Sequence, residues 1–458
     1  MADGKERLPF LTKLIYGSGD LGFSITSTII GFLFAMYLTD VVRLDPGLAA
    51  AAVFVGRTCD YINDPLMGHI SDRMRTRWGR RRPFLLFGFV PFALTFVLLW
   101  WIPPIASQIG LAIYYAIAYV IFDTAATFAY MPYFALTPEL TLDYDERTSL
   151  TSYRMLFSIL GSLFAFVLAP MVTGETEPQN SSRFLLMAAI FATASALPLL
   201  LVFLGTRERP EFQAQVQPTV KQSLQAALRN RPFRFAVVIY LLTWTSVAIV
   251  QAVLLFFLKH RIGLAADERD LVTGTIFVVA LFALPLWTWA SRRWDKRLSY
   301  IAGVAFWAAV QIVLVVVSPG WGMTVFLVLA GLAGIGVAAA HVLPWAIIPD
   351  AVEWDQLVTG QRHEGMFYSL ITLAEKVASS IAIPLSLLVL KLTGYSADLA
   401  AQPDSAVLGI QVLMGPVPAV LLCAGILFAL FYPLGRERHA QIRAELAARR
   451  SGGPHADD

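Results

Sequence analysis

Two long stretches of this chain contain no charged side chain, and they constrain its fold more than any other feature. Phe84–Phe122 holds 39 residues and Leu298–Pro349 holds 52 without Asp, Glu, Lys or Arg. A membrane-spanning helix needs about 20 apolar residues, so each stretch is long enough for two spans. Only 15% of all residues are charged, against roughly 25% in soluble domains. The sequence therefore predicts an all-α, polytopic membrane protein.

The pattern of apolar segments predicts twelve transmembrane helices. Their expected ranges are 11–39, 46–71, 83–102, 108–137, 147–172, 183–205, 233–258, 268–291, 298–317, 322–348, 364–391 and 408–434. Similar basic loops, DRMRTRWGRRR and SRRWDKR, follow the second and eighth segments, which indicates a duplicated six-helix unit. We therefore expect an N-terminal six-helix bundle over residues 1–206, a connector over 207–232, a C-terminal six-helix bundle over 233–435 and a tail over 436–458.

The distribution of basic residues predicts the orientation of the chain. If the N-terminus is cytoplasmic, the cytoplasmic loops and tails carry 26 of the 35 Lys and Arg residues. Cytoplasmic loops of membrane proteins are enriched in these residues, so both termini are expected in the cytoplasm. The net charge of +3 then reflects topology, and we expect no nucleic-acid partner.

The stretch DYIND places polar groups inside the second predicted span. Asp60 and Asp64 are one helical turn apart, with Asn63 beside them. Two carboxylates this close cannot both stay ionised in a dry site without a counter-charge, and hard cations prefer oxygen ligands. Pro65 weakens the backbone ladder at the same level and makes a carbonyl available. The pattern favours a site for a coupling ion, and the alternative is a salt-bridge role with Arg57 and Lys376.

Several other ionisable residues lie inside the predicted spans. Each costs at least about 2.5–3.5 kcal/mol at a helix centre, so each is a candidate functional residue. For Arg57, three residues before Asp60, a structural salt bridge is the favoured interpretation. His341 lies alone in the second uncharged stretch, where a core role is more common than a role as ligand. The remaining residues of this kind are Asp20, Asp123, Arg154, Glu375 and Lys376.

Long segments of the chain resemble one family of transporters. FVGRTCDYINDPLMGHISDRMRTRWGRRRPFLLFG, YMPYFALTPELTLDYDERTSLTSYR and IIPDAVEWDQLVTGQRHEGMFYSLITLAEK are similar to segments of the glycoside–pentoside–hexuronide:cation symporters, a branch of the major facilitator superfamily. The resemblance implies the major facilitator fold of two six-helix bundles, an inner (plasma) membrane of the bacterial type, and symport by alternating access.

The resemblance also implies roles for individual residues. Asp60, Asn63 and Asp64 match the cation-binding acids and amide of that family, and Thr127 matches a hydroxyl of the same site. Arg154 and Lys376 match residues near the cation and substrate pockets. Lys376 could pair with Asp60 or Asp64 when the ion is absent, and this pairing would couple ion binding to helix packing. We therefore expect Arg57 and Lys376 to act in coupling.

The substrate half of the site departs from the family pattern. A Lys–Asp pair expected in the first helix is replaced by Phe23 and Ser24, and a third acid in the fourth helix by Tyr130. Asp20 lies one turn before Ser24, Asp123 lies one turn before Thr127, and His341 replaces an aromatic residue. The expected substrate-binding residues are Asp20, Ser24, Asp123, Tyr130, Arg154, His341 and Lys376.

Two substrate classes are compatible with these departures. The main expectation is a sugar, glycoside or sugar acid, for which Arg154 and Lys376 could bind a carboxylate. The alternative is an amphiphile, because the animal sodium-dependent lysophospholipid symporters share the acid pair and the PYFALT stretch at 132–137 and lack the sugar-binding acids.

An enzyme is the disfavoured interpretation. The six His residues show no metal-site spacing such as HExxH, so no catalytic residue and no cofactor is expected beyond the coupling ion, Na⁺ or H⁺. The only metal expected is that monovalent cation at Asp60 and Asp64. The expected partners are a small-molecule substrate and membrane lipid, and the chain is expected to be a monomer.

Overall fold

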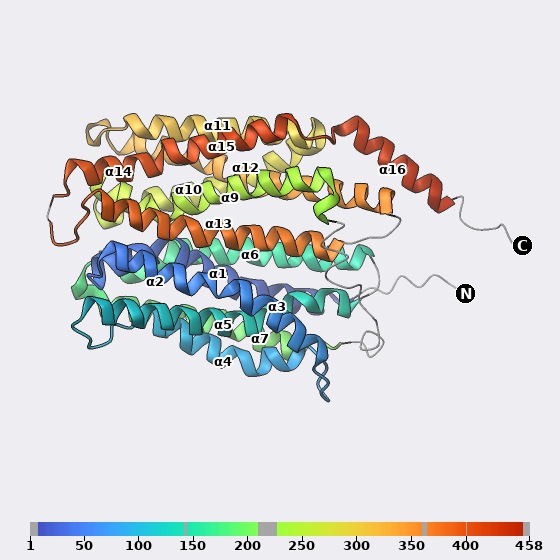
Figure 1. Ribbon diagram of the computed structural model, residues 1–458, viewed down its shortest axis with the longest axis horizontal. Coiled ribbons are helices and arrows are strands. Elements are labelled where there is room, and N and C mark those ends of the chain that lie inside the picture. Colours follow the sequence, from blue (N-terminus) through green and yellow to red (C-terminus); the bar gives the residue numbers. More distant parts are fainter. Residues whose placement is uncertain (1–7, 142–143, 209–226, 360–363, 400, 452–458) are drawn as a thin grey trace, which may run out of the picture. The chain divides into compact units, whose positions relative to one another are not determined.

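A computed structural model describes residues 8–141, 144–208, 227–359, 364–399 and 401–451. This part of the chain is built from helices joined by short connections (Figure 1). The helices are α1 (Phe10–Met36), η1 (Tyr37–Val41), α2 (Pro46–Thr58), α3 (Asp60–Arg73), α4 (Arg82–Leu99), α5 (Gln108–Leu140), α6 (Tyr144–Thr173), η2 (Pro178–Asn180), α7 (Ser181–Gly205), α9 (Arg231–Phe256), η4 (Phe257–Ile262), α10 (Ala266–Arg293), α11 (Lys296–Val316), η5 (Pro319–Trp321), α12 (Met323–Thr359), α13 (Glu364–Leu392), α14 (Asp404–Met414), α15 (Pro416–Leu430) and α16 (Arg436–Ser451).

Within the described residues, eleven of the twelve predicted spans appear as helical segments long and apolar enough to cross a membrane. The exception is 46–71, which was expected as one helix and is divided into α2 and α3 at Cys59. The chain keeps its direction there, since the amide of Asn63 donates to the carbonyl of Cys59 at 2.9 Å. Pro65 has no amide proton, and the ladder is therefore weakened one turn further on. The second predicted span is thus interrupted directly before the acid pair.

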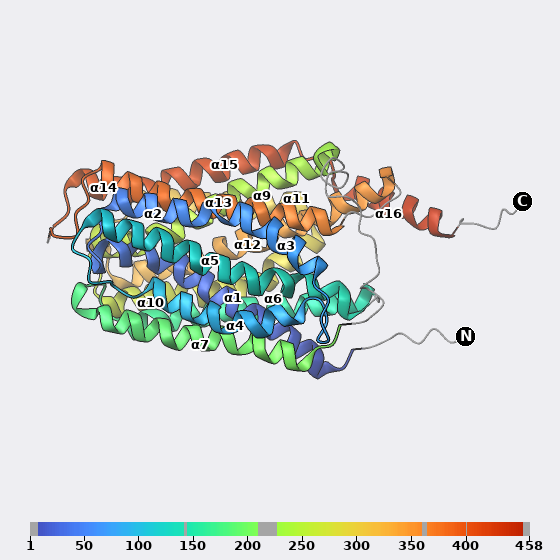
Figure 2. The ribbon, with the colours of Figure 1, turned by 60° about the horizontal axis from the view of Figure 1, so that its bottom comes forward.

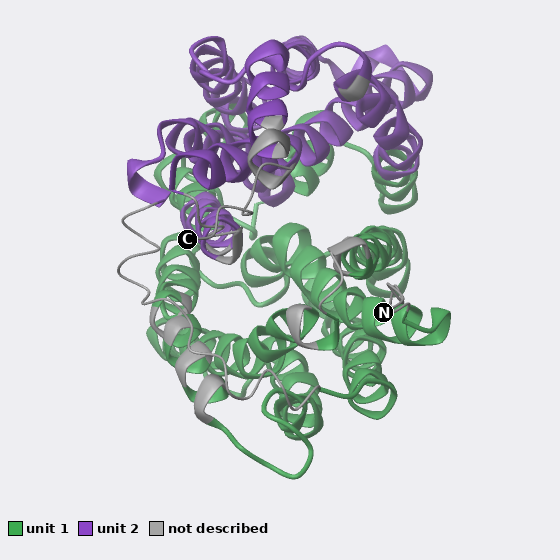
Figure 3. Cartoon of the chain, turned by 90° about the vertical axis from the view of Figure 1, so that its right-hand side faces the viewer, with its two compact units in different colours: residues 1–216, 254–274, 383–409 green, residues 217–253, 275–382, 410–458 purple. Residues whose placement is uncertain are grey.

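The chain divides into two compact units (Figure 3). Unit 1 comprises residues 1–216, 254–274 and 383–409, and unit 2 comprises 217–253, 275–382 and 410–458. Unit 1 thus contains the first six predicted spans together with end segments of later helices. Most of the expected connector, residues 209–226, lies outside the described residues, and the expected tail begins with α16. The boundaries of the two expected six-helix bundles stay a prediction.

In unit 1, α1 packs against α6 and α7, while α4 packs against α5 and α7. Helices α2 and α3 follow one another along α5, as Figure 2 shows. The contact between α1 and α7 is close at Gly22, where an added Cβ would lie 2.1 Å from the carbonyl oxygen of Ser195. Only a glycine fits at this position of α1.

We expect Gly22→Ala to destabilise unit 1. Overpacking costs about 1–3 kcal/mol, and here the obstacle is backbone, which cannot rotate away. Gly274→Ala is the matched control, because a Cβ at that helical glycine would meet nothing within 4 Å. The melting temperature of the purified protein should fall by several degrees for Gly22→Ala and hold or rise for Gly274→Ala. Equal effects of the two substitutions would contradict the packing argument.

In unit 2, α9 packs against α12 and α13 through a buried core that includes Phe233, Ile348 and Phe367. Helix α11 lies between α12 and α15. The C-terminal helix α16 contacts α12 through His439, whose Nε2 lies 3.3 Å from Asp350 and 2.8 Å from Glu353. These contacts anchor α16 to the helical core of unit 2.

Candidate functional site

The predicted cation site lies where α3 meets α5. Helices α2 and α3 follow one another in the same direction as α5, because their first residues lie together: Gln108 at the start of α5 accepts a hydrogen bond from the amide of Asp45 just before α2. This arrangement brings Asp64 of α3 to Thr127 of α5, whose hydroxyl donates to Asp64 Oδ1 at 3.1 Å. One turn away, Asn63 Nδ2 donates to Thr124 Oγ1 at 2.9 Å.

These contacts bring together three of the four predicted cation-site residues, Asn63, Asp64 and Thr127. Asp60 begins α3, and its side chain lies outside what the structure describes. The site offers a carboxylate, an amide and two hydroxyls, and oxygen donors of this kind suit hard cations. Among the described residues no group of three or more His, Cys, Asp or Glu side chains is arranged so that it could hold a metal ion. The arrangement suits a monovalent ion held by one carboxylate and neutral oxygens.

A second polar cluster joins α1 to α6. Arg154 Nε lies 3.2 Å from Asp20 Oδ2, and the Asp20 side chain is only 6% exposed. The Arg154 guanidinium also lies over the rings of Tyr133 and Phe134. Because a buried charge must be paired, the two helices are held together here by mutual neutralisation. The same two charges could instead bind the charged groups of a ligand.

Ser24 belongs to this cluster. Its hydroxyl lies 2.6 Å from that of Ser158 on α6 and donates to the carbonyl of Asp20. The structure thus brings together three predicted substrate-binding residues, Asp20, Ser24 and Arg154, on two helices of unit 1.

Two further predicted substrate residues lie on α5. The ring of Tyr130 packs against Phe23 with centroids 5.3 Å apart, and its buried hydroxyl makes no hydrogen bond within the described part of the chain. Asp123 is half-buried one turn before Thr127. The Tyr130 hydroxyl is a buried polar group that a ligand could satisfy.

The other predicted residues have different surroundings. The guanidinium of Arg57 lies 5.8 Å from the centroid of the Tyr119 ring on α5. His341 belongs to unit 2, where its Nδ1 donates to the carbonyl of Val337 at 2.9 Å and its ring packs against Trp244.

Lys376 is half-buried on α13 in unit 2. Its neighbour Glu375 accepts a hydrogen bond from Tyr240 at 2.9 Å. Because Asp60 and Asp64 belong to unit 1, the pairing of Lys376 with either acid stays a prediction.

Sequence reasoning missed a buried charge cluster in unit 1 at the end of α1. Asp40, 3% exposed, accepts hydrogen bonds from Lys259 Nζ at 2.8 Å, from the Tyr395 hydroxyl at 2.6 Å and from Thr39 at 2.9 Å. His260 Nε2 lies 4.0 Å from the same carboxylate. Burial and the neighbouring Asp40 carboxylate raise the pKa of the Tyr395 hydroxyl far above its ordinary value, so this group stays a donor.

The cluster lies where the two halves of the sequence meet within unit 1. Asp40 follows the first predicted span, whereas Lys259 follows the seventh and Tyr395 the eleventh. Three further ion pairs at the same end join the halves in the same way: Glu175 with Arg269, Asp45 with Lys391, and Arg43 with Asp398.

The Asp45 pair stays charged at neutral pH. Partial burial raises the pKa of the Asp45 carboxyl, but hydrogen bonds from Lys391 and from the amides of Leu48 and Gly47 lower it more, so the pKa lies below its ordinary value.

The two helices that carry this cluster end alike. α1 continues into the π-helix η1, and α9 continues into the π-helix η4. A residue with positive φ follows each one, Arg43 at 62° and Gly263 at 82°. In both, a leucine amide then bonds back six residues, from Leu44 to Leu38 and from Leu264 to Leu258. These matching ends support the duplicated unit that the basic loops indicated.

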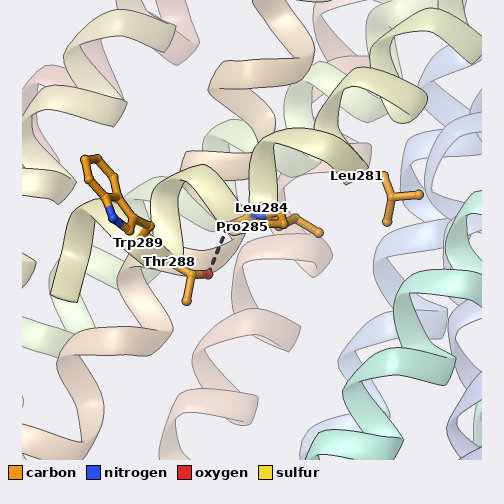
Figure 4. A pocket seen from close by; sticks show the side chains of 5 residues that line it. All are labelled: Leu281, Leu284, Pro285, Thr288 and Trp289. Atoms are coloured by element: carbon orange, nitrogen blue, oxygen red, sulfur yellow. Dashed lines mark hydrogen bonds between the residues drawn. The ribbon is translucent and has the colours of Figure 1, made fainter. Parts of the chain in front are cut away.

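An apolar groove lies on α10 in unit 2 (Figure 4). It is lined by Leu281, Leu284, Pro285, Thr288 and Trp289, and the Thr288 hydroxyl donates to the carbonyl of Leu284. Pro285 cannot donate to the carbonyl of Leu281. No predicted site residue lines the groove. An apolar surface of this kind is ordinary on a helix that faces lipid, so the polar clusters of unit 1 are the better candidate site.

Comparison with known proteins gives consistent results. The MFS/sugar transport protein family matches residues 15–436. An uncharacterized symporter of Synechocystis is 33% identical, with 97% of this chain and 98% of that protein covered. The sodium-dependent lysophosphatidylcholine symporter 1-A of Danio rerio is 28% identical, with 96% of this chain and 89% of that protein covered.

Solved structures share the fold. The D-xylose–proton symporter superposes with a TM-score of 0.65 at 19% identity, over 92% of this chain and 96% of that one. The predicted major facilitator fold is therefore confirmed, as is a multi-pass membrane protein. The finer assignment to the glycoside–pentoside–hexuronide branch stays a resemblance. With the family match over residues 15–436 and the 33% identical symporter, the chain belongs to the MFS/sugar transport protein family of transporters.

Proposed function

We propose that this protein is a cation-coupled symporter of a lysophospholipid or a related amphiphile. The observation that carries the substrate class is the contact between Phe23 and Tyr130, 5.3 Å between centroids. These rings occupy the positions where the resembling sugar carriers have charged groups for sugar hydroxyls. The similarity to lysophosphatidylcholine symporters over nearly the whole chain supports this alternative over the sugar first expected.

The cation would bind at Asn63, Asp64 and Thr127, together with Asp60. Its single positive charge would offset one carboxylate and lower the net charge of the site, and a site with less charge crosses a low-dielectric barrier at less cost. When the ion is absent, Lys376 would offset the acids instead, as expected from the sequence. Empty and fully loaded carriers would then reorient more readily than a carrier with one ligand, which is the basis of coupling.

A zwitterionic headgroup would meet the pair formed by Asp20 and Arg154. A phosphate bonds well to a guanidinium, and the Asp20 carboxylate would then face the positive group of the same ligand. When the headgroup binds, each of the two side chains would exchange its protein partner for a ligand group of opposite charge, so that no buried charge is left unpaired. The Tyr130 hydroxyl could donate to an ester or phosphate oxygen.

Alternating access would require opening at the cluster around Asp40. The predicted orientation places this end of unit 1 outside the cell. Within unit 1 the first half of the chain is joined here to segments 254–274 and 383–409, as in a carrier closed on that side. Since the relative from Synechocystis is bacterial, we expect the protein in a bacterial plasma membrane.

Thermal stabilisation of the purified protein would test the proposal. Lysophosphatidylcholine, a sugar panel and uronic acids would be added with Na⁺, with Li⁺, or with choline chloride at equal ionic strength and two pH values. A ligand bound to the folded state alone raises the melting temperature. We expect stabilisation by the lysolipid, and more of it with the coupling ion. Stabilisation by a sugar alone among the ligands would establish the sugar alternative, and no ion dependence would contradict cation coupling.

A further inference from the structure

Thr124 contacts the predicted cation site, and the family resemblance gives it no role. It lies on α5 one turn before Thr127, beside Asn63 of α3. Its hydroxyl has two partners, the carbonyl of Val120 at 2.7 Å and Asn63 Nδ2 at 2.9 Å. Their chemistry determines how Asn63 is oriented.

A hydroxyl has one proton to donate. A carbonyl oxygen can only accept a hydrogen bond, so the Thr124 hydroxyl must donate its single proton to the carbonyl of Val120. Toward Asn63 the Thr124 oxygen can then only accept. The amide must therefore present its NH₂ group to Thr124, and its carbonyl oxygen must be turned elsewhere.

We propose that Thr124 is a positioning residue that holds the Asn63 carbonyl oxygen toward the coupling cation, an inference that rests on the proposed cation coupling. A flipped Asn63 would present NH₂ donors, which repel a cation. Asp64 follows Asn63 in the chain, and its carboxylate accepts a hydrogen bond from Thr127 at 3.1 Å. An Asn63 carbonyl oxygen that is turned away from Thr124 would add a neutral oxygen donor beside this charged carboxylate. Thr124 acts on the ion through Asn63 and need not touch it.

The test compares Thr124→Val with Thr124→Ser in the full-length protein. Valine keeps the shape of the threonine side chain but has no oxygen to accept from Asn63, whereas serine keeps the hydroxyl. Loss of a group that orients a metal ligand typically weakens metal binding 10- to 100-fold. We expect Thr124→Val to raise the Na⁺ concentration for half-maximal thermal stabilisation by about 10-fold, with Thr124→Ser close to wild type. Thr193→Val is the matched control, because Thr193 makes the same bond to a carbonyl four residues back and lies on α7.

A double-mutant cycle separates positioning from a merely structural role. In an Asn63→Ala background, Thr124→Val should weaken Na⁺ binding no further, since the carbonyl it orients is gone. An additive effect would overturn the proposal, as would Na⁺ affinity unchanged by Thr124→Val.

The two proposals fail in different ways. A wild-type protein that responds to no cation contradicts cation coupling itself. A wild-type protein that responds to pH alone keeps coupling but overturns the role of Thr124, because a proton needs no carbonyl ligand. A Na⁺ response that Thr124→Val leaves intact overturns the role of Thr124 alone.

Discussion

Replacing Asp64 with alanine is expected to abolish cation-driven uptake while leaving the protein folded in the membrane. The substitution removes the only charged ligand whose contact at the site is described, the carboxylate that accepts from Thr127 at 3.1 Å. An ion in a low-dielectric site needs a compensating charge, and Asn63 and Thr127 supply none. Asp60 would remain, but it lies one helical turn from the position of the carboxylate that Thr127 contacts.

Uptake into proteoliposomes under an imposed Na⁺ or H⁺ gradient measures this effect. We expect a loss of at least 100-fold in uphill uptake, which corresponds to roughly 2.7 kcal/mol. Binding of the amphiphile without the ion should persist, since Asp20 and Arg154 are unchanged. Asp64→Asn tests charge separately from shape and should fail as well. Uphill uptake at the wild-type level in Asp64→Ala would remove Asp64 from the cation site.

The helices could be predicted from the sequence because membrane spans depend on composition alone. The uncharged stretches 84–122 and 298–349 each overlap two spans in the structure. The interruption of 46–71 at Cys59 was not predicted, because hydropathy averages over such a break. Pro65, which lies six residues beyond the break, was interpreted only as the source of a free carbonyl.

The acids of the proposed cation site could be singled out from the sequence for a similar reason. Asp60 and Asp64 lie on one helix, and their spacing alone places them on one face. Thr127 followed from a family resemblance. Thr124 could not be found in this way, since its role depends on which residue of α3 lies opposite α5, and a single sequence without homologues does not contain that register.

The cluster at Asp40 was missed because of where its members lie in the chain. Asp40, Lys259 and Tyr395 follow three different spans, and charges at span ends are commonly solvated. Each looks like an ordinary loop residue until tertiary structure joins them. A signal was nevertheless present: in a duplicated unit the ends of the first and seventh spans match, and one carries an acid, Asp40, whereas the other carries a base, Lys259.

Substituting Asp40 is the second large effect that we expect, because the cluster would hold one end of the carrier closed. Removing one member of a buried ion pair costs about 3–5 kcal/mol. Lys259 is 26% exposed, which reduces this to roughly 2 kcal/mol, about a 30-fold shift in the equilibrium between closed and open forms. Asp40→Ala should therefore favour the form that is open at this end and lower the rate of uptake.

The matched control separates this role from general weakening of the same end. Asp398 also pairs across the two halves, with Arg43, but its side chain is 84% exposed, and exposed pairs contribute about 0–1 kcal/mol. Asp398→Ala should therefore leave the equilibrium nearly unchanged. Spin labels at Ser107 and Asp404, in a background without Cys59 and Cys423, would report the opening as a longer distance. If both substitutions lengthen the distance between the labels equally, or if neither does, then burial of the Asp40 ion pair does not stabilise the closed form. If only Asp40→Ala does, one buried carboxylate with three donors outweighs an exposed ion pair at the same end.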